Sequence, residues 1–315
     1  MTFLPQHPSE GTERERPSLV VARAARLLAA AGIESPRAEA ELLGAYVLEV
    51  PRGRLALADG FTPAQRERLD ALVARRVTRE PLQHLTGVAG FRHLELAVGP
   101  GVFVPRPETE LLAGWGVAQG RRHAAPLVVD LCSGSGAIAL AVAQELPAAR
   151  VVAVERSPAA LDWLRRNAAA RAAAGDTPIE VVAADVTAPD LLADLVGRVD
   201  VLLCNPPYVP RSMAVPPEVA GHDPDEAVFG GGDGLDVIRP VVARAAELLR
   251  PGGALGIEHD DTHGAAVPGL LAADGRYAHV EEHRDLAGRP RFATASRRAD
   301  GQHADAAPAW QTGSS

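Results

Sequence analysis

The sequence predicts an α/β fold in which a doubly wound parallel sheet follows a small helical bundle. From about Pro107 onward, short apolar runs typical of buried strands alternate with longer helical segments. That order produces a parallel sheet with helices on both faces. From Ser18 to Glu80, apolar residues recur instead at three- and four-residue spacing, which is typical of amphipathic helices packed into a bundle. One large domain and one smaller domain are therefore expected.

The domain limits follow from local signals along the chain. Ser35-Pro36 and Thr62-Pro63 each combine a capping residue with a proline at the first helical position, and they predict two helix starts. Alternating apolar and polar residues around a Gly99-Pro100-Gly101 turn predict a β-hairpin. The predicted organisation is a disordered N-terminus at 1–17, a helical domain at 18–86, a β-hairpin linker at 87–106, the sheet domain at 107–298 and a disordered tail at 299–315.

Composition narrows the class of protein. The 315 residues are 47% hydrophobic, enough to bury a sizeable core. No apolar run is long enough to span a bilayer, and the opening residues lack the charged-then-apolar order of a signal peptide. A cytoplasmic protein without a membrane partner is expected. The net charge of -8 argues against direct nucleic-acid binding, because phosphate contacts need Lys and Arg. The basic residues from Arg66 to Arg79 are interleaved with acids and predict a solvated helix face.

Cysteine and histidine usage gives no sign of a disulfide framework or a metal site. Cys132 and Cys204 fall at strand ends, and they are expected to be reduced packing residues. His259 and His263, at helical spacing, are expected at the surface because no third ligand set accompanies them. No metal is therefore predicted.

A glycine loop follows the first predicted strand of the sheet. The strand at 127–130 ends in Asp130, and an apolar helical segment follows the loop. Glycines allow close approach of the backbone to a ligand, and the N–H groups at a helix start favour polar or anionic groups. The predicted cofactor contacts here are Asp130, Cys132, Ser133, Gly134, Ser135 and Gly136. Because the run from Gly134 to Ala139 also fits the G-x-G-x-x-A fingerprint, a nicotinamide or flavin dehydrogenase is a rival at this point.

Acidic residues end the next two predicted strands. Glu155 follows the strand at 151–154, where a carboxylate can accept hydrogen bonds from ribose hydroxyls. Asp185 follows the strand at 180–184 and can accept from an exocyclic adenine amine, while Val186 continues the wall of the base pocket. Asp185 is equally well explained as a cap for a following helix.

The segment Asn205-Pro206-Pro207-Tyr208 comes directly after a fourth predicted strand, 199–204. Two prolines fix the backbone and remove two N–H donors, so the Asn205 side-chain oxygen and the Pro206 carbonyl remain as acceptors for an NH2 group. A rigid turn is the alternative interpretation. Tyr208 is expected either to pack on the substrate side chain or to be a core tyrosine bonded elsewhere. Acids, a glycine loop and this segment at the ends of four strands are typical of an S-adenosylmethionine methyltransferase acting on nitrogen.

Several segments together resemble the release factor glutamine methyltransferases, over roughly Pro81 to Ala295. They are Pro105-Arg106-Pro107-Glu108-Thr109-Glu110, the run from Asp130 to Leu140, Asn205-Pro206-Pro207-Tyr208, Gly230-Gly231-Gly232-Asp233-Gly234-Leu235-Asp236 and Asp285-Leu286-Ala287-Gly288. The resemblance implies a Rossmann-like class I methyltransferase domain that uses S-adenosylmethionine. It also implies methylation of the glutamine side-chain amide in the Gly-Gly-Gln motif of class I peptide chain release factors, which the helical domain would grip.

The resemblance also assigns roles to residues. It implies a catalytic segment at Asn205, Pro206, Pro207 and Tyr208, with Asn205 reaching the cofactor as well, and substrate contacts from these residues with Arg106 and Glu108. Three places depart from the usual pattern: Cys132 stands where glycine is commoner, His259-Asp260-Asp261 follows Glu258, and His222-Asp223-Pro224-Asp225-Glu226 replaces a segment that carries glutamate before the proline. Cys132 still permits a backbone contact to a ligand if its φ is negative.

Two further interpretations stay open. A methyltransferase acting on an exocyclic amino group of DNA or RNA shares the Asn-Pro-Pro-Tyr segment, although it would need a basic groove and a means of flipping its base. A cofactor-binding protein without turnover, acting through a partner, is the other.

Overall fold

The computed structural model describes residues 14–299, and these form two compact units. The first runs to Gly87 and includes Ala220–His222, and the second holds Val88–Val219 and the chain from Asp223 onward. Most of the predicted disordered termini, residues 1–13 and 300–315, lies outside the described residues. Among the described residues, no helix is both long and apolar enough to cross a membrane.

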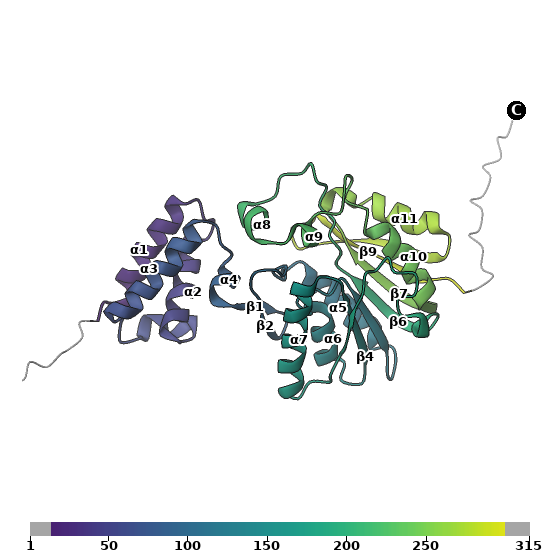
Figure 1. Ribbon diagram of the computed structural model, residues 1–315, viewed down its shortest axis with the longest axis horizontal. Coiled ribbons are helices and arrows are strands. Elements are labelled where there is room, and N and C mark those ends of the chain that lie inside the picture. The colour runs from purple at the N-terminus through teal and green to yellow at the C-terminus, as the bar shows by residue number, and fades with distance from the viewer. Residues whose placement is uncertain (1–13, 300–315) are drawn as a thin grey trace, which may run out of the picture. The chain divides into compact units, whose positions relative to one another are not determined.

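The first unit consists of helices (Figure 1). They are α1 (Pro17–Ala30), α2 (Pro36–Leu48), η1 (Arg52–Leu57), α3 (Pro63–Val77) and α4 (Leu82–Thr86), while α8 (Pro217–His222) is divided between the units. Both predicted helix starts are confirmed. Thr62 forms a capping box with Gln65, whose N–H donates to the Thr62 hydroxyl at 3.3 Å, so orphan N–H groups of the first turn are satisfied. Leu28, Leu43 and Phe61 lie fully buried between the helices.

Two sequence predictions about this unit are wrong in part. Residues 14–17 are not disordered, because Glu15 pairs with the buried Phe61 through two backbone hydrogen bonds of 2.9 Å and α1 already begins at Pro17. The predicted solvated face of α3 also has an exception. Arg76 is buried, and its guanidinium donates to the Glu39 carboxylate at 2.6 Å, which offsets the cost of removing its charge from water.

The β-hairpin forms, but its turn is not the predicted one. Strands β1 (Val88–Phe91) and β2 (Leu94–Ala97) are antiparallel, and the chain reverses at Arg92 in a left-handed conformation, φ 51°. The Arg92 guanidinium donates to Glu145 at 2.9 Å, a contact 53 residues away, which favours an arginine where glycine is the usual choice. Gly99 instead packs on Trp163, whose ring would lie 2.6 Å from an added Cβ.

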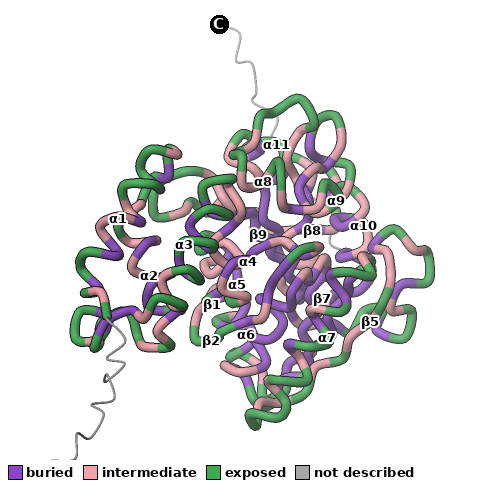
Figure 2. The backbone as a smooth tube through the Cα atoms, turned by 60° about the vertical axis from the view of Figure 1, so that its left-hand side comes forward, coloured by how far each residue is buried: buried purple, intermediate pink, exposed green. Residues whose placement is uncertain are grey.

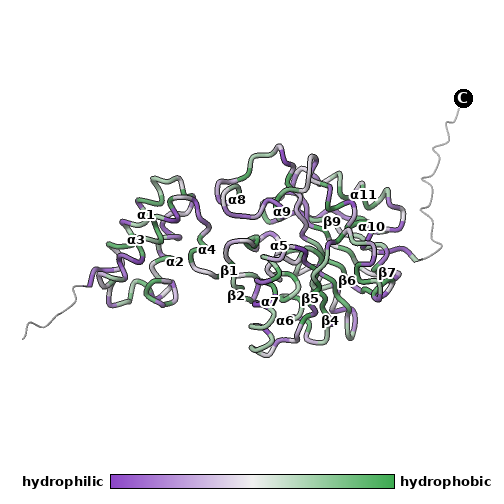
Figure 3. Tube along the Cα trace, in the orientation of Figure 1, coloured by the Kyte–Doolittle hydropathy of each residue, from purple (hydrophilic) through white to green (hydrophobic). Residues whose placement is uncertain are grey.

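The second unit is built on a seven-stranded sheet of order β5-β4-β3-β6-β7-β9-β8. Its strands are β3 (Leu127–Leu131), β4 (Arg150–Glu155), β5 (Glu180–Ala183), β6 (Val199–Cys204), β7 (Leu249–Glu258), β8 (Tyr277–Arg284) and β9 (Pro290–Arg297). The first five are parallel, and β9 runs antiparallel to both β7 and β8. The central strands β4, β3 and β6 and the second half of β7 are hydrophobic and buried (Figures 2 and 3), as expected for a parallel sheet covered on both faces.

Helices cover the two faces of this sheet. They are α5 (Thr109–Gly120), α6 (Ala137–Glu145), α7 (Pro158–Ala173), α10 (Ile238–Leu248) and α11 (Ala266–Asp274), while the short helix α9 (Asp225–Val228) and the turns η2 (Ala193–Leu195) and η3 (Asp261–His263) lie in the connections. Because side chains alternate along a strand, Val128 packs with α5, α6 and α7 whereas Val129 packs with α10 and α11. The predicted doubly wound fold is confirmed.

Candidate active site

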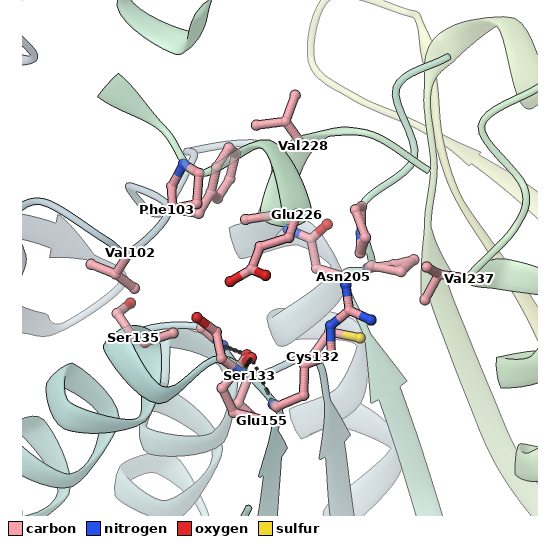
Figure 4. Close-up of a pocket in the computed structure, with 18 of the residues that line it drawn as sticks. Val102, Phe103, Cys132, Ser133, Ser135, Glu155, Asn205, Glu226, Val228 and Val237 are labelled. Carbon is pink, nitrogen blue, oxygen red and sulfur yellow. Dashed lines mark hydrogen bonds between the residues drawn. The ribbon is translucent and has the colours of Figure 1, made fainter. Parts of the chain in front are cut away.

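A cavity of about 270 Å³ opens beyond the carboxyl ends of β3, β4, β5 and β6. Its volume is near the lower end of small-molecule sites, roughly 300–1,000 Å³. The strand order reverses between β3 and β6, and ligands bind at such a switch point in open α/β sheets. Every lining residue belongs to the second unit. Figure 4 shows side chains from the glycine loop, β4 and β6 around this space.

The glycine loop forms the floor of the cavity. Cys132, Ser133, Gly134 and Ser135 line it, whereas Gly136 does not and instead caps the start of α6. The condition of a negative φ at Cys132 is not met, since φ is 60°. This left-handed conformation favours glycine and explains why glycine is commoner in such loops. Both cysteines are free thiols, as predicted.

Asp130 lies beneath the loop and does not reach the cavity. Its Oδ2 accepts from the Ala139 N–H at 3.1 Å, and the Ser133 hydroxyl donates to its backbone carbonyl at 2.9 Å. Burial raises the pKa of the Asp130 carboxyl to about 7. The predicted cofactor contact from Asp130 is therefore not direct, because its side chain holds the start of α6 and its backbone carbonyl holds the loop.

Glu155 lines the cavity and ties the loop to β4. Its Oε2 accepts from the Gly134 N–H at 2.9 Å, and its Oε1 accepts from the N–H groups of Arg156 and Ser157, both at 2.8 Å. A carboxylate has about four acceptor positions. Backbone groups therefore occupy three of these positions and leave roughly one for a ligand.

Asp185 and Val186 line the side of the cavity beyond β5. No helix begins at Asp185, so the helix-cap alternative is wrong in that form. Instead Asp185 Oδ1 caps a turn, accepting from the N–H and the hydroxyl of Thr187 at 2.8 and 2.7 Å. Its Oδ2 accepts from Arg156 at 3.1 Å. The Thr187 and Arg156 hydrogen bonds lower the pKa of the Asp185 carboxyl, which keeps it an acceptor.

The predicted catalytic segment lies at the end of β6, and Asn205, Pro206, Pro207 and Tyr208 all line the cavity. The segment from Gly230 to Gly234 supports it from behind. An added Cβ at Gly230 would lie 2.6 Å from the Pro207 carbonyl oxygen, and one at Gly234 would lie 2.3 Å from that of Tyr208. Only glycine permits this approach, so the glycine-rich segment fixes the path of the backbone at the site.

Side chains beside Asn205 form a buried polar cluster with Thr109 and Glu258. Asn205 Nδ2 donates to the Thr109 hydroxyl at 3.2 Å, and the Tyr208 hydroxyl donates to Glu258 Oε1 at 3.0 Å. Of the two alternatives for Tyr208, the hydroxyl bonded elsewhere is the one observed. Burial raises the pKa of Glu258 to about 7, against the lowering effect of the Thr109 and Tyr208 hydroxyls.

Arg106 and Glu108, both predicted to bind substrate, lie in different environments. Arg106 lines the cavity, donates to the buried Asp223 carboxylate at 2.7 Å and stacks over Phe103 at 4.6 Å from the ring centroid. Asp223 thus supplies the carboxylate in the departing segment from His222 to Glu226. Glu108 is exposed before α5 and does not line the cavity, so its predicted substrate contact stays a prediction.

The departure after Glu258 is also explained by packing. His259 and His263 are 0% and 6% exposed, so their predicted surface position is wrong. The His259 ring contacts Glu282 Oε2 through Nε2 and the Asp260 carbonyl through Nδ1, both at 2.9 Å. His263 contacts the Asp233 carbonyl at 2.9 Å. Both rings therefore hold loops around the site.

Sequence reasoning assigned no role to several residues that line the cavity. They are Val102, Phe103, Thr109, Glu226, Val228 and Val237. Thr109 stands inside the Pro-Arg-Pro-Glu-Thr-Glu segment, which was a usable signal. Val102, Phe103 and Val237 come from loops with no pattern of their own, whereas Glu226 and Val228 belong to the short helix α9. Only the fold brings these residues to the cavity. Glu226 points into it from the side opposite the glycine loop (Figure 4).

The cavity can therefore bind a cation beside an NH2 group. Carboxylates of Glu155, Asp185 and Glu226 line it, and no N–H is available from Pro206 or Pro207. Within the described residues, Asn205 Oδ1 has no hydrogen-bond partner. Acceptors thus outnumber donors next to Asn205.

Comparison with known proteins gives consistent matches. The PrmC N-terminal domain matches residues 20–87 and the methyltransferase small domain matches residues 117–219. A release factor glutamine methyltransferase of Mycolicibacterium smegmatis is 54% identical over 86% of this chain and 94% of its own. One of Mycobacterium tuberculosis is 48% identical over 87% and 89%. A 4-amino-L-phenylalanine/4-methylamino-L-phenylalanine methyltransferase of Streptomyces pristinaespiralis is 41% identical over 80% and 86%.

Proposed function

The chain belongs to the release factor glutamine methyltransferase family, and from this membership we propose its reaction. It is a methyltransferase that uses S-adenosylmethionine to methylate the side-chain amide nitrogen of the glutamine in the Gly-Gly-Gln motif of class I peptide chain release factors. The membership removes the dehydrogenase rival, which left the Asn-Pro-Pro-Tyr segment unexplained.

The residues around the cavity suit S-adenosylmethionine. This cofactor, when bound, supplies an electrophilic methyl group on a positively charged sulfur. The carboxylates that line the cavity complement that charge. An added Cβ at Gly134 would meet nothing within 4 Å, so the loop leaves open space for a ligand. We assign the remaining acceptor position of Glu155 to a ribose hydroxyl, Asp185 and Val186 to the adenine, and the loop at 132–135 to the amino-acid end.

Asn205 and Pro206 orient the substrate amide. An amide nitrogen is a poor nucleophile because its lone pair is delocalised into the carbonyl. If Asn205 Oδ1 and the Pro206 carbonyl accept its two N–H bonds, the nitrogen is held with its lone pair aimed away from these acceptors, and orientation supplies much of the acceleration. No base is needed beforehand, because the methylated nitrogen is acidic and loses its proton to water. A glutamate in place of glutamine would leave the acceptors unpaired, at a cost of about 1–3 kcal/mol each.

One observation supports this proposal most strongly: Asn205 Oδ1 has no hydrogen-bond partner within the described residues, and Asn205 lines the same cavity as the glycine loop. The test is mass spectrometry of a purified class I release factor after incubation with this protein and isotope-labelled S-adenosylmethionine. We expect one labelled methyl group on the glutamine of the Gly-Gly-Gln motif and none when that glutamine is replaced by asparagine. An unmodified release factor alongside intact cofactor binding would contradict the proposal.

A second candidate function is methylation of a small aromatic amine. The Streptomyces pristinaespiralis relative, 41% identical, is named for such a substrate, and a pair of acceptors can hold an aryl NH2 group as well as an amide. Incubation with 4-amino-L-phenylalanine separates the two candidates. Turnover of the free amine without turnover of the release factor would select this second function.

A further inference from the structure

The hydrogen-bond donors and acceptors of the polar cluster beside Asn205 favour one order. Glu258 is 1% exposed at the end of β7, and Thr109, 4% exposed, begins α5. Glu258 Oε1 accepts from Tyr208, whereas Oε2 has no hydrogen-bond partner within the described chain. The Thr109 hydroxyl accepts from Asn205 Nδ2 at 3.2 Å, and it lies close enough to the Glu258 carboxyl to lower the pKa of that group. Leaving a carboxylate oxygen buried without a hydrogen bond costs free energy. Glu258 is therefore the favoured acceptor for the Thr109 hydroxyl proton.

One proton on Thr109 decides how the Asn205 amide lies. A hydroxyl donates once and accepts twice. When Thr109 donates to Glu258, it can offer only a lone pair to Asn205, and the Asn205 NH2 must then face it, as the 3.2 Å contact from Nδ2 has it. The Asn205 oxygen is consequently turned to the cavity. An amide turned the other way would present NH2 to the substrate NH2, two donors facing each other.

We propose that Thr109 and Glu258 are positioning residues that fix the Asn205 side-chain amide with its oxygen toward the substrate nitrogen. The inference rests on the proposed function, since it assigns the orientation of the group that would hold the substrate amide. Neither residue touches the reacting atoms in this role. Thr109 acts through Asn205, and Glu258 acts through Thr109.

The charge on Glu258 governs this arrangement. An ionised carboxylate only accepts, but a protonated one can donate to Thr109 and release its hydroxyl to donate to Asn205 Oδ1. Around Glu258 stand Tyr208 after β6, Arg291 on β9, and Glu108 before α5. Burial raises the pKa of Glu258 to about 7, while Arg291 favours the ionised form and Glu108 opposes it. Asp285 holds Arg291 in place at 3.0 Å.

The test compares Thr109→Val, which removes the hydroxyl and keeps the shape, with Thr109→Ser, which keeps the hydroxyl. Single-turnover methyl transfer to a release factor is measured at saturating substrate and pH 8. We expect Thr109→Val to lower the rate about tenfold or more, the equivalent of one oriented hydrogen bond. Thr109→Ser should stay within about threefold, and cofactor affinity by calorimetry should change little in either variant. A wild-type rate for Thr109→Val, or an equal loss in Thr109→Ser, would overturn the inference.

Glu258→Gln provides a second test with a readout that a purely structural role would not move. The wild-type rate should rise with pH through about 7, where Glu258 ionises, and the Glu258→Gln profile should lack this rise. The same rise in both proteins would contradict the role of Glu258. Asn205→Ala tests the proposed function apart from this inference. Normal turnover in Asn205→Ala would contradict the proposed function. Lost turnover in Asn205→Ala together with normal turnover in Thr109→Val would contradict this inference alone.

Discussion

The two halves of the cavity are held by different kinds of contact. On the cofactor half, Glu155 accepts three hydrogen bonds from backbone N–H groups, so the loop and its carboxylate form one rigid piece. On the amide half, Asn205 is held by the side chain of Thr109, with Tyr208 and Glu258 behind it. The first set of contacts needs only the Glu155 side chain, because any residue other than proline supplies a backbone N–H, whereas both partners in the second set are side chains. A substitution in one half should therefore impair either cofactor binding or methyl transfer and leave the other largely intact.

The largest effect is expected from Asn205→Ala. The variant removes the acceptor assigned to the substrate amide, and loss of one such preorganised group typically lowers kcat by roughly 10²–10³-fold. Cofactor affinity should be nearly unchanged, because the glycine loop and Glu155 are left intact. A radiolabelled methyl-transfer assay and a calorimetric titration measure the two quantities. Undiminished turnover would remove Asn205 from the mechanism.

Glu155→Ala should show the reverse pattern. Loss of a charged hydrogen-bond partner should weaken S-adenosylmethionine binding roughly 10- to 100-fold, and loss of the Gly134 contact should loosen the loop. At saturating cofactor, kcat should fall much less than the affinity does. Titration calorimetry checks this, with Asn205→Ala as the matched control. An unchanged dissociation constant would refute the ribose assignment.

The buried acids predict a pH dependence of stability. Burial raises the pKa values of Asp130 and Glu258 to about 7 in the folded protein, whereas unfolded carboxyls titrate near roughly 4. Between these values the folded state binds more protons, so the free energy of unfolding falls as pH rises. Below about pH 4 the two carboxyls are protonated in both the folded and the unfolded state, so they do not change the free energy of unfolding. Above about pH 7 they lower the free energy of unfolding by the full amount.

Urea denaturation at several pH values between about 5 and 8 measures this slope. We expect a loss on the order of 2 kcal/mol per carboxyl. Glu258→Gln and Asp130→Asn should each remove the contribution of one carboxyl to this slope. The two variants therefore distinguish these acids from the histidines, which titrate in the same pH range. A slope that persists unchanged in both variants would show that these carboxyls are already ionised in the folded protein at pH 5.

The smallest effect is expected at Cys132. Its φ of 60° carries strain of roughly 1 kcal/mol for a residue with a side chain. Cys132→Gly should raise the free energy of unfolding by up to about 1 kcal/mol, partly offset by the entropy of glycine in the unfolded chain. Cys132→Val, with its branched side chain, should lower it by about 1–2 kcal/mol. Equal stability of the two variants would argue against backbone strain here.

Much of the fold and half of the site could be predicted because their signals are local. Strand, loop and acid follow one another within a few residues at Glu155 and Asp185, and proline after a capping residue marks the helix starts at Pro36 and Pro63. Parallel strands then bring their carboxyl ends to one edge of the sheet. The order of elements along the chain was therefore enough to gather these residues.

Contacts between distant segments could not be predicted. Asn205 and Thr109 are 96 residues apart, and Arg106 and Asp223 are 117 apart. The hairpin turn at Arg92 likewise depends on Glu145, whereas the Gly99-Pro100-Gly101 run turns the chain after β2 and not between the hairpin strands. The burial of His259 follows from Glu282 on β8. Each of these outcomes needs a partner that only folding supplies.

The sequence by itself determined the α/β order and the positions of the glycine loop and the Asn-Pro-Pro-Tyr segment at strand ends, because these arise from neighbouring residues. The tertiary structure decided which way the acceptor amide lies, which acids have a raised pKa and which candidate contacts face away from the cavity. The physical reason is that the direction of a hydrogen bond and the pKa of an acid depend on the groups that surround them in space. The spacing of residues along the sequence does not specify those groups.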